Sequence, residues 1–162
     1  MLATSAAVPL LLTLAACAGP DPLDGPPPLS HDVRALLAAI GAERNLVTTY
    51  ARTLASYSAL APVLSPLLGE HRAHLAQLRA RLTVPPGASP AAAASLARPG
   101  RPAAIPATGR AAVAQLRDAE QAASAAQLSR VVTVGGSLAQ LFASIAASEA
   151  THVTALDERG PA

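Results

Sequence analysis

Apolar residues recur at alternating steps of three and four in four separate stretches of the chain. These stretches cover residues 30–60, 65–82, 110–132 and 137–157. A helix that buries one face repeats its apolar positions at this spacing, whereas a half-buried strand alternates every second residue. The pattern therefore predicts an all-α fold built from four helices.

The second and third predicted helices are separated by a long link, residues 83–109, which is rich in Pro, Ala and Gly. A helix of 20 residues is about 30 Å long, and an extended Pro-rich chain covers about 3.1 Å per residue. The link is long enough to return the chain from one end of a bundle to the other. We therefore predict an antiparallel four-helix bundle with one long crossover. The alternative is two independent hairpins, each with too small a core to be stable alone.

Each predicted helix has polar residues near the middle of its apolar stripe. They are Glu43 in the first helix, His71 and His74 in the second, Glu120 in the third, and Glu149 and His152 in the fourth. Glu is almost never fully buried unless it is paired, and the burial of each ion costs several kcal/mol. A bound cation compensates for this cost, and clustered carboxylates and imidazoles are ligands of iron, manganese and zinc. These six residues are the candidate metal ligands.

The height of each candidate ligand along its helix tests whether the six can meet. In the second hairpin, the three candidates lie level around a turn near Gly135. In the first hairpin, Glu43 is farther than His74 from a turn near Ala61, and at 1.5 Å per residue the offset is roughly 7 Å. We therefore expect good alignment in the second hairpin and poorer alignment in the first.

The order of these residues resembles the ligand pattern of ferritin-like di-metal carboxylate proteins. In that superfamily, two helices each contribute a single Glu and two contribute Glu-x-x-His, and the bundle has one long crossover. Glu43 and Glu120 match the single glutamates, and Glu149-x-x-His152 matches one paired motif. The similarity covers residues 31–158 and extends to ferritin-like lipoproteins of GC-rich bacteria.

The second helix departs from the superfamily pattern. It carries His71-x-x-His74, so a histidine stands where the bridging carboxylate is expected, and Glu70 is an alternative ligand beside it. Tyr50 matches a Glu-then-Tyr pattern of the first helix, although packing in the core is its simpler role. Sites of this superfamily oxidise iron, reduce peroxide or activate dioxygen. The resemblance implies a di-metal centre of iron or manganese, and the additional histidine also suits zinc or copper.

A metal-free interpretation stays open at the level of sequence. In it the buried glutamates pair with the histidines or with arginines such as Arg44, Arg72 and Arg117. The bundle is then a structural or protein-interaction module without chemistry of its own. The sequence does not decide between the two interpretations, nor whether a bound metal would make the protein an enzyme.

An apolar run at residues 3–16 ends in the tetrad Leu-Ala-Ala-Cys at Cys17. The run is shorter than the about 20 residues that span a bilayer, and a short apolar segment closing on small residues is typical of a secretory signal. The tetrad resembles the bacterial lipobox, whose Cys becomes the lipidated first residue. This implies a signal peptide at 1–17, a Pro- and Gly-rich tether at 18–30, and an extracytoplasmic domain anchored to the membrane. Without lipidation of Cys17 the protein would be secreted.

Composition narrows the choice of partners. Charged residues make up 14% of the 162 residues, the formal net charge is +2, and aromatic residues make up 2%. A nucleic-acid-binding surface needs a basic patch, which this composition does not supply. The single Cys excludes an internal disulfide and a Cys-rich zinc site. The expected partners are the membrane, through the lipid anchor, and a second copy at most, because the short tethered chain suits a monomer or homodimer rather than a cage.

Overall fold

The computed structural model describes residues 25–159, and these residues contain helices and no strand. The four long helices are α1 (His31–Ser56), α2 (Ala61–Arg81), α4 (Gly109–Val131) and α5 (Gly136–Arg159). The all-α prediction is confirmed for the described residues. The predicted signal peptide, the lipobox Cys17 and tether residues 18–24 lie outside them. None of the described helices is long and apolar enough to cross a membrane.

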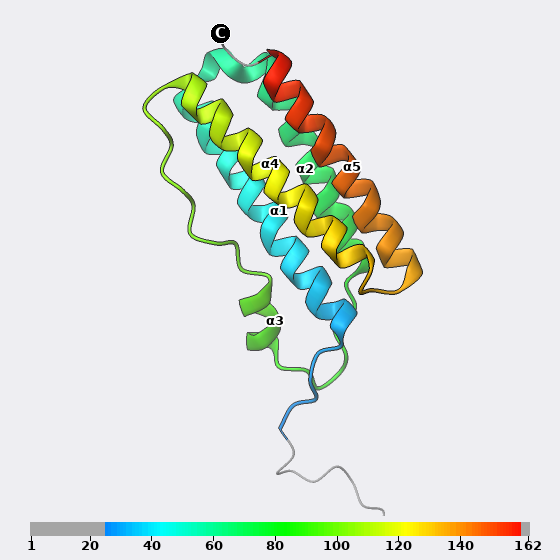
Figure 1. Cartoon of the computed structure of the whole chain (residues 1–162). Coiled ribbons are helices and arrows are strands. Elements are labelled where there is room, and N and C mark those ends of the chain that lie inside the picture. Colours follow the sequence, from blue (N-terminus) through cyan, green and yellow to red (C-terminus); the bar gives the residue numbers. More distant parts are fainter. Residues whose placement is uncertain (1–24, 160–162) are drawn as a thin grey trace, which may run out of the picture.

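The four long helices lie side by side and run in alternating directions within two hairpins (Figure 1). Helices α1 and α2 form one hairpin, and α4 and α5 form the other. Helix α1 also packs against α4, and α2 packs against α5. The two hairpins therefore share one interior instead of folding as independent units.

The crossover between the hairpins follows the outer side of α1 (Figure 1). The sequence predicts an irregular link at residues 83–109, but the structure contains the short helix α3 (Pro90–Leu96) within it. The side chain of Ser89 accepts a hydrogen bond from the backbone N–H of Ala92, and Pro90 occupies the first turn. An N-cap of this kind followed by an alanine run is sufficient to start a helix.

Close approach of the crossover to α1 depends on Gly41. A Cβ atom at this position would lie 3.0 Å from the carbonyl oxygen of Arg98 and 3.2 Å from that of Leu96. Two arginines of α1 bind the crossover backbone: Arg44 Nη1 donates to the carbonyl of Ala97 at 3.3 Å, and Arg52 Nη1 donates to that of Ala103 at 2.8 Å. The crossover is thereby fixed along α1.

The junction of the first hairpin differs from the sequence prediction. Helix α1 ends at Ser56 rather than near residue 60, because Tyr57 leaves the helical conformation with φ −135° and ψ 71°. A short 3₁₀ turn, η1 (Ser58–Leu60), follows, and α2 begins at Ala61 rather than at residue 65. The early start places Pro62 in the first turn, where a missing N–H costs no helical hydrogen bond, but it also places Pro66 inside the helix, where one such bond is lost.

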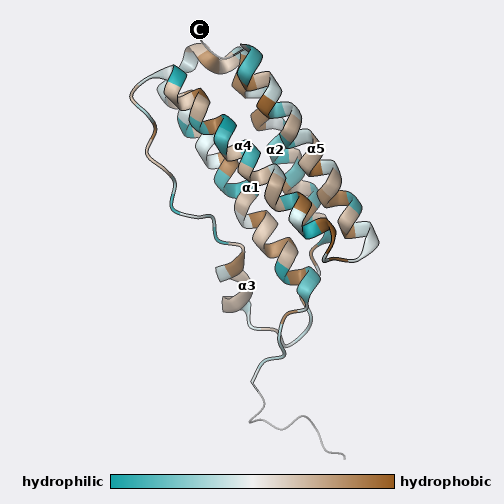
Figure 2. Ribbon diagram, in the orientation of Figure 1, coloured by the Kyte–Doolittle hydropathy of each residue, from teal (hydrophilic) through white to brown (hydrophobic). Residues whose placement is uncertain are grey.

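Two clusters of buried apolar residues fill the interior. The first cluster comprises Ala35, Leu36, Ala39, Ile40, Leu75, Leu78, Leu138, Leu141, Phe142 and Ile145. The second comprises Tyr50, Leu64, Leu67, Leu68, Val113, Leu116 and Leu156. Figure 2 shows that apolar and polar residues alternate along each long helix, as expected for elements that bury one face. The two clusters leave a layer between them near the middle of the helices.

Candidate metal centre

Six polar side chains occupy the layer between the two apolar clusters. They are the six predicted ligands: Glu43 from α1, His71 and His74 from α2, Glu120 from α4, and Glu149 and His152 from α5. Each is buried, and none exposes more than 8% of its surface. On α1, for example, Glu43 lies between Ile40 of the first cluster and Tyr50 of the second. The layer therefore arises where each apolar stripe is interrupted.

Glu43, His71 and His74 form one potential ligand group. Glu43 Oε2 lies 3.0 Å from His71 Nδ1, and Glu43 Oε1 lies 3.3 Å from His74 Nδ1. One potential ligand atom from each residue lies within 4.8 Å of the others. Two ligands that bind one ion at about 2.1 Å and at right angles lie about 3.0 Å apart. These three side chains already have the spacing of neighbouring ligands.

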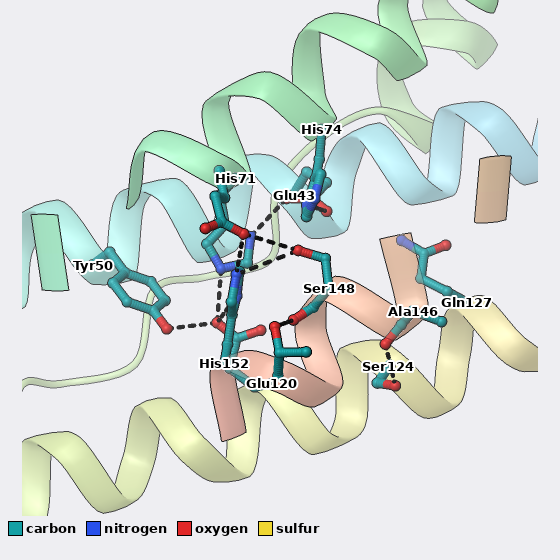
Figure 3. A network of polar contacts seen from close by, with 12 residues as sticks. Glu43, Tyr50, His71, His74, Glu120, Ser124, Gln127, Ala146, Ser148 and His152 are labelled. Atoms are coloured by element: carbon teal, nitrogen blue, oxygen red, sulfur yellow. Dashed lines mark hydrogen bonds and ion pairs between the residues drawn. The ribbon is translucent and has the colours of Figure 1, made fainter. Parts of the chain in front are cut away.

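His71, Glu120 and His152 form a second group, which shares its histidine with the first (Figure 3). Glu120 Oε1 lies 2.7 Å from His71 Nε2 and 3.4 Å from His152 Nδ1. The rings of His71 and His152 meet edge to face, with centroids 4.9 Å apart. The ring of His71 therefore contacts one glutamate through each of its two nitrogens.

The first hairpin is better aligned than the sequence predicts. The expected offset of roughly 7 Å between Glu43 and His74 assumes a turn centred near Ala61. Because α1 already ends at Ser56, the break is centred three residues earlier, near Ser58. Glu43 and His74 then lie equally far from the break, and their side chains meet. The predicted offset is wrong because the sequence gives no sharp signal for the end of α1.

Glu149 lies in the same buried layer but belongs to neither three-residue group. Neither of its carboxylate oxygens has a hydrogen-bond partner in the described part of the chain. Burial, followed by the negative charges of Glu43 and Glu120, raises the pKa of Glu149 to about 8. Burial and the neighbouring charges therefore favour the neutral form of this carboxyl group.

The other charges in the layer are partly balanced by His71. Burial by itself would lower the pKa of His71, but its hydrogen bonds to Glu120 and Glu43 raise it to about 9. Burial opposes ionisation of Glu120, yet its close contacts with the His152 and His71 imidazoles lower the pKa of Glu120 to about 2. The pKa of Glu43 is also lowered, because its close contacts with the His71 and His74 imidazoles outweigh its burial. A protonated His71 between two carboxylates thus supplies a positive charge inside the layer.

The layer also contains most of the unsatisfied polar atoms in the described part of the chain. Six of these buried atoms belong to predicted ligands: Glu43 Oε1, His74 Nδ1, Glu120 Oε2, Glu149 Oε1, Glu149 Oε2 and His152 Nδ1. A buried polar atom without a partner costs about 1–3 kcal/mol, and such atoms are rare in folded proteins. Their concentration at one point is difficult to explain by packing but is expected of atoms that bind an ion.

Two residues outside the six, Glu70 and Ser148, contact the ring of His152. Glu70, whose side chain is 53% exposed, lies 2.9 Å from His152 Nε2, on the ring edge opposite Glu120. Ser148 donates to the same Glu70 oxygen at 3.0 Å. Glu70 is therefore placed to fix the ring of His152 from outside rather than to replace His71 as a ligand. Sequence reasoning missed Ser148, and its only signal is its position one turn before His152.

Tyr50 combines the two roles that the sequence suggests for it. Its ring is fully buried in the second apolar cluster. Its hydroxyl donates to Glu120 Oε1 at 2.6 Å, beside the bond from His71 (Figure 3). This donor holds the carboxylate of Glu120 in a fixed orientation.

Arginines do not neutralise the buried glutamates. Arg117 pairs with Asp118 and Asp157 at the surface, and Arg44 binds the crossover backbone. No arginine in the described residues forms a salt bridge with any of the three. The metal-free interpretation also allows the glutamates to pair with histidines. This pairing is observed, since His71 pairs with Glu43 and with Glu120.

Comparisons with protein-family models, with curated proteins and with solved structures found no match for this chain. An assignment of function therefore rests on the residues and geometry of the site.

Proposed function

We propose that this protein binds divalent transition-metal ions in the buried layer formed by Glu43, His71, His74, Glu120, Glu149 and His152. The observation that carries this proposal is the convergence of six buried, unpartnered ligand atoms from all four long helices. A bound cation would satisfy these atoms and offset the cost of burying the carboxylates. It would also replace the charge that His71 supplies in the metal-free protein.

The ligand set favours first-row transition metals. Three carboxylates and three imidazoles suit iron and manganese, and the share of imidazole also makes zinc and copper candidates. The chain would then be a ferritin-like four-helix bundle with a di-metal centre, in which His71 stands where a bridging carboxylate is expected. If iron or manganese is bound, reaction with peroxide or dioxygen is the activity to measure first.

Metal analysis of the purified full chain tests this proposal. We expect stoichiometric iron, manganese, zinc or copper that is lost in the double variant Glu43→Ala/Glu149→Ala. Thr53→Val is the matched control, because it removes a buried hydroxyl of α1 that has no hydrogen-bond partner and lies outside the ligand groups. A folded chain that takes up no metal and keeps its melting temperature when each metal is added would refute the proposal. It would support the metal-free structural or interaction module.

We further propose that Cys17 is lipidated and anchors the domain outside the cytoplasm. The support is the Leu-Ala-Ala-Cys tetrad at the end of the apolar run, followed by a Pro- and Gly-rich stretch. Two acyl chains provide stable membrane attachment, whereas one gives only marginal binding. Labelling of cells with a fatty acid should mark the wild type but not Cys17→Ser. An unlabelled wild type in the soluble extracytoplasmic fraction would indicate an ordinary secretory signal instead.

A further inference from the structure

His71 is the one residue that belongs to both potential ligand groups. Its two ring nitrogens lie on different edges of the ring, and each contacts a glutamate of a different helix, α1 or α4. Nδ1 lies 3.0 Å from Glu43 Oε2, and Nε2 lies 2.7 Å from Glu120 Oε1. The side chain is fully buried, so its ring is confined between the two glutamates.

The two groups match each other in composition. On the Nδ1 side, α1 supplies a glutamate and α2 a histidine, Glu43 and His74, whose facing atoms lie 3.3 Å apart. On the Nε2 side, α4 supplies a glutamate and α5 a histidine, Glu120 and His152, whose facing atoms lie 3.4 Å apart. Each side of the His71 ring therefore has one carboxylate and one further imidazole within reach.

The unpartnered atoms are also divided between the two sides. On one side, His74 Nδ1 and Glu43 Oε1 are buried and lie 3.3 Å apart, but they form no hydrogen bond. On the other side, His152 Nδ1 and Glu120 Oε2 are buried and also form no hydrogen bond. A single ion bound to one group would leave the free atoms of the other group unsatisfied. Two ions satisfy both sets.

We propose that the layer binds two divalent ions, one on each ring nitrogen of His71, which bridges them as an imidazolate. This inference rests on the proposed metal-binding function. Glu43 and His74 complete one ion, and Glu120 and His152 complete the other. Glu149, whose two buried oxygens have no partner, is the remaining ligand for either ion. Both ring protons of His71 pass to solvent as the two ions bind.

The bridge makes this centre different from one spanned by carboxylates. Ions that share small oxygen bridges lie about 3.5–4 Å apart, whereas an imidazole ring holds two ions farther apart because its nitrogens are separated by a ring carbon. When both ions are paramagnetic, as copper(II) is, the shared ring couples them magnetically through the bonds between its two nitrogens. Metals with a strong preference for imidazole, such as copper and zinc, suit this arrangement.

Copper(II) titration of the full chain, followed by electron paramagnetic resonance, tests the bridge. The chain carries Cys17→Ser for this experiment, so that its only Cys does not reduce or bind copper. We expect two copper ions per chain and a low-temperature signal well below that of two independent ions. In His71→Gln, the two coppers should bind more weakly and give the full signal of uncoupled ions. His31→Gln, at a largely exposed histidine, is the matched control and should behave as the parent chain.

Removal of the terminal histidines provides a test that does not depend on the folding of the His71 variant. His74→Gln and His152→Gln should each bind one copper tightly, with an uncoupled signal. Coupling that persists in His71→Gln would overturn the bridge, as would copper–copper scattering at or below about 4 Å in X-ray absorption. A wild type that binds one copper also overturns the bridge but leaves the proposed metal binding intact, whereas a chain that binds none defeats both.

Discussion

The Nε2 atom of His71 lies 2.7 Å from Oε1 of Glu120, and both side chains are fully buried between two apolar clusters. An ion pair in such surroundings costs several kcal/mol to desolvate and does not by itself favour folding. A neutral apolar pair would pack at this position without that cost. Stability alone is therefore a weak reason for this pair, and the proposed metal binding supplies another.

The stability of the metal-free protein should depend on pH in a defined way. The pKa of His71 rises from 6.5 to about 9 on folding, so its stabilising contribution is complete below pH 6.5 and disappears as pH rises through 9. The pKa of Glu120 falls from 4.5 to about 2, so its contribution is complete above pH 4.5 and disappears as pH falls towards 2. In urea unfolding with a chelator present, the loss of these two contributions should lower the free energy of unfolding below about pH 4.5 and again above about pH 6.5. A free energy of unfolding that is constant from pH 6 to 9 would contradict the pairing of His71.

Glu149→Gln should separate stability from metal binding. The raised pKa of Glu149, about 8, means that the folded state resists its ionisation, so wild-type stability declines as pH rises from 4.5 through 8. The metal-free variant should be similar to the wild type at pH 5 and more stable at pH 9, measured by urea unfolding. Its affinity for metal should fall by more than about tenfold, or about 1.4 kcal/mol. Unchanged affinity would remove Glu149 from the ligand set.

Glu70→Ala tests the support of His152 from outside the layer. Glu70 lies 2.9 Å from His152 Nε2, so its loss frees the ring to rotate away from Glu120. Loss of such a partner of a metal-binding His weakens metal binding by about 10- to 100-fold. Gln77→Ala, at an exposed position on the same helix, is the control and should leave the affinity unchanged. Equal affinities for both variants would mean that Glu70 does not position the ligand.

Tyr50→Phe and Tyr57→Phe form a matched pair. Tyr50 donates to Glu120 and Tyr57 donates to the carbonyl of Pro106, both at 2.6 Å. Loss of either hydroxyl should cost about 0.5–1.5 kcal/mol of folding free energy, the typical net contribution of one hydrogen bond. Tyr50→Phe alone should also change the metal affinity, measured by competition with a chelator. An equal effect of both substitutions on affinity would show that Tyr50 acts through the fold rather than through Glu120.

Much of the site can be predicted from the sequence, because the spacing of residues along a helix determines which way their side chains face. Residues three or four apart share one face, so the interruption of an apolar stripe by Glu43 or by Glu149 and His152 places those side chains towards the interior. Helix ends are harder to predict. The exit of the chain at Tyr57 depends on contacts with the crossover, including the bond to Pro106, and no local signal marks it.

The sequence by itself determined the all-α class, the interior placement of the six polar residues, and the existence of a long crossover. The tertiary structure alone decided how those residues meet. It set the early end of α1 that brings Glu43 level with His74, the orientation of the His71 ring between Glu43 and Glu120, and the reach of Glu70 across to His152. The physical reason is that periodicity fixes which face a side chain occupies, whereas the distance between two side chains on different helices depends on how those helices are packed and where each one ends.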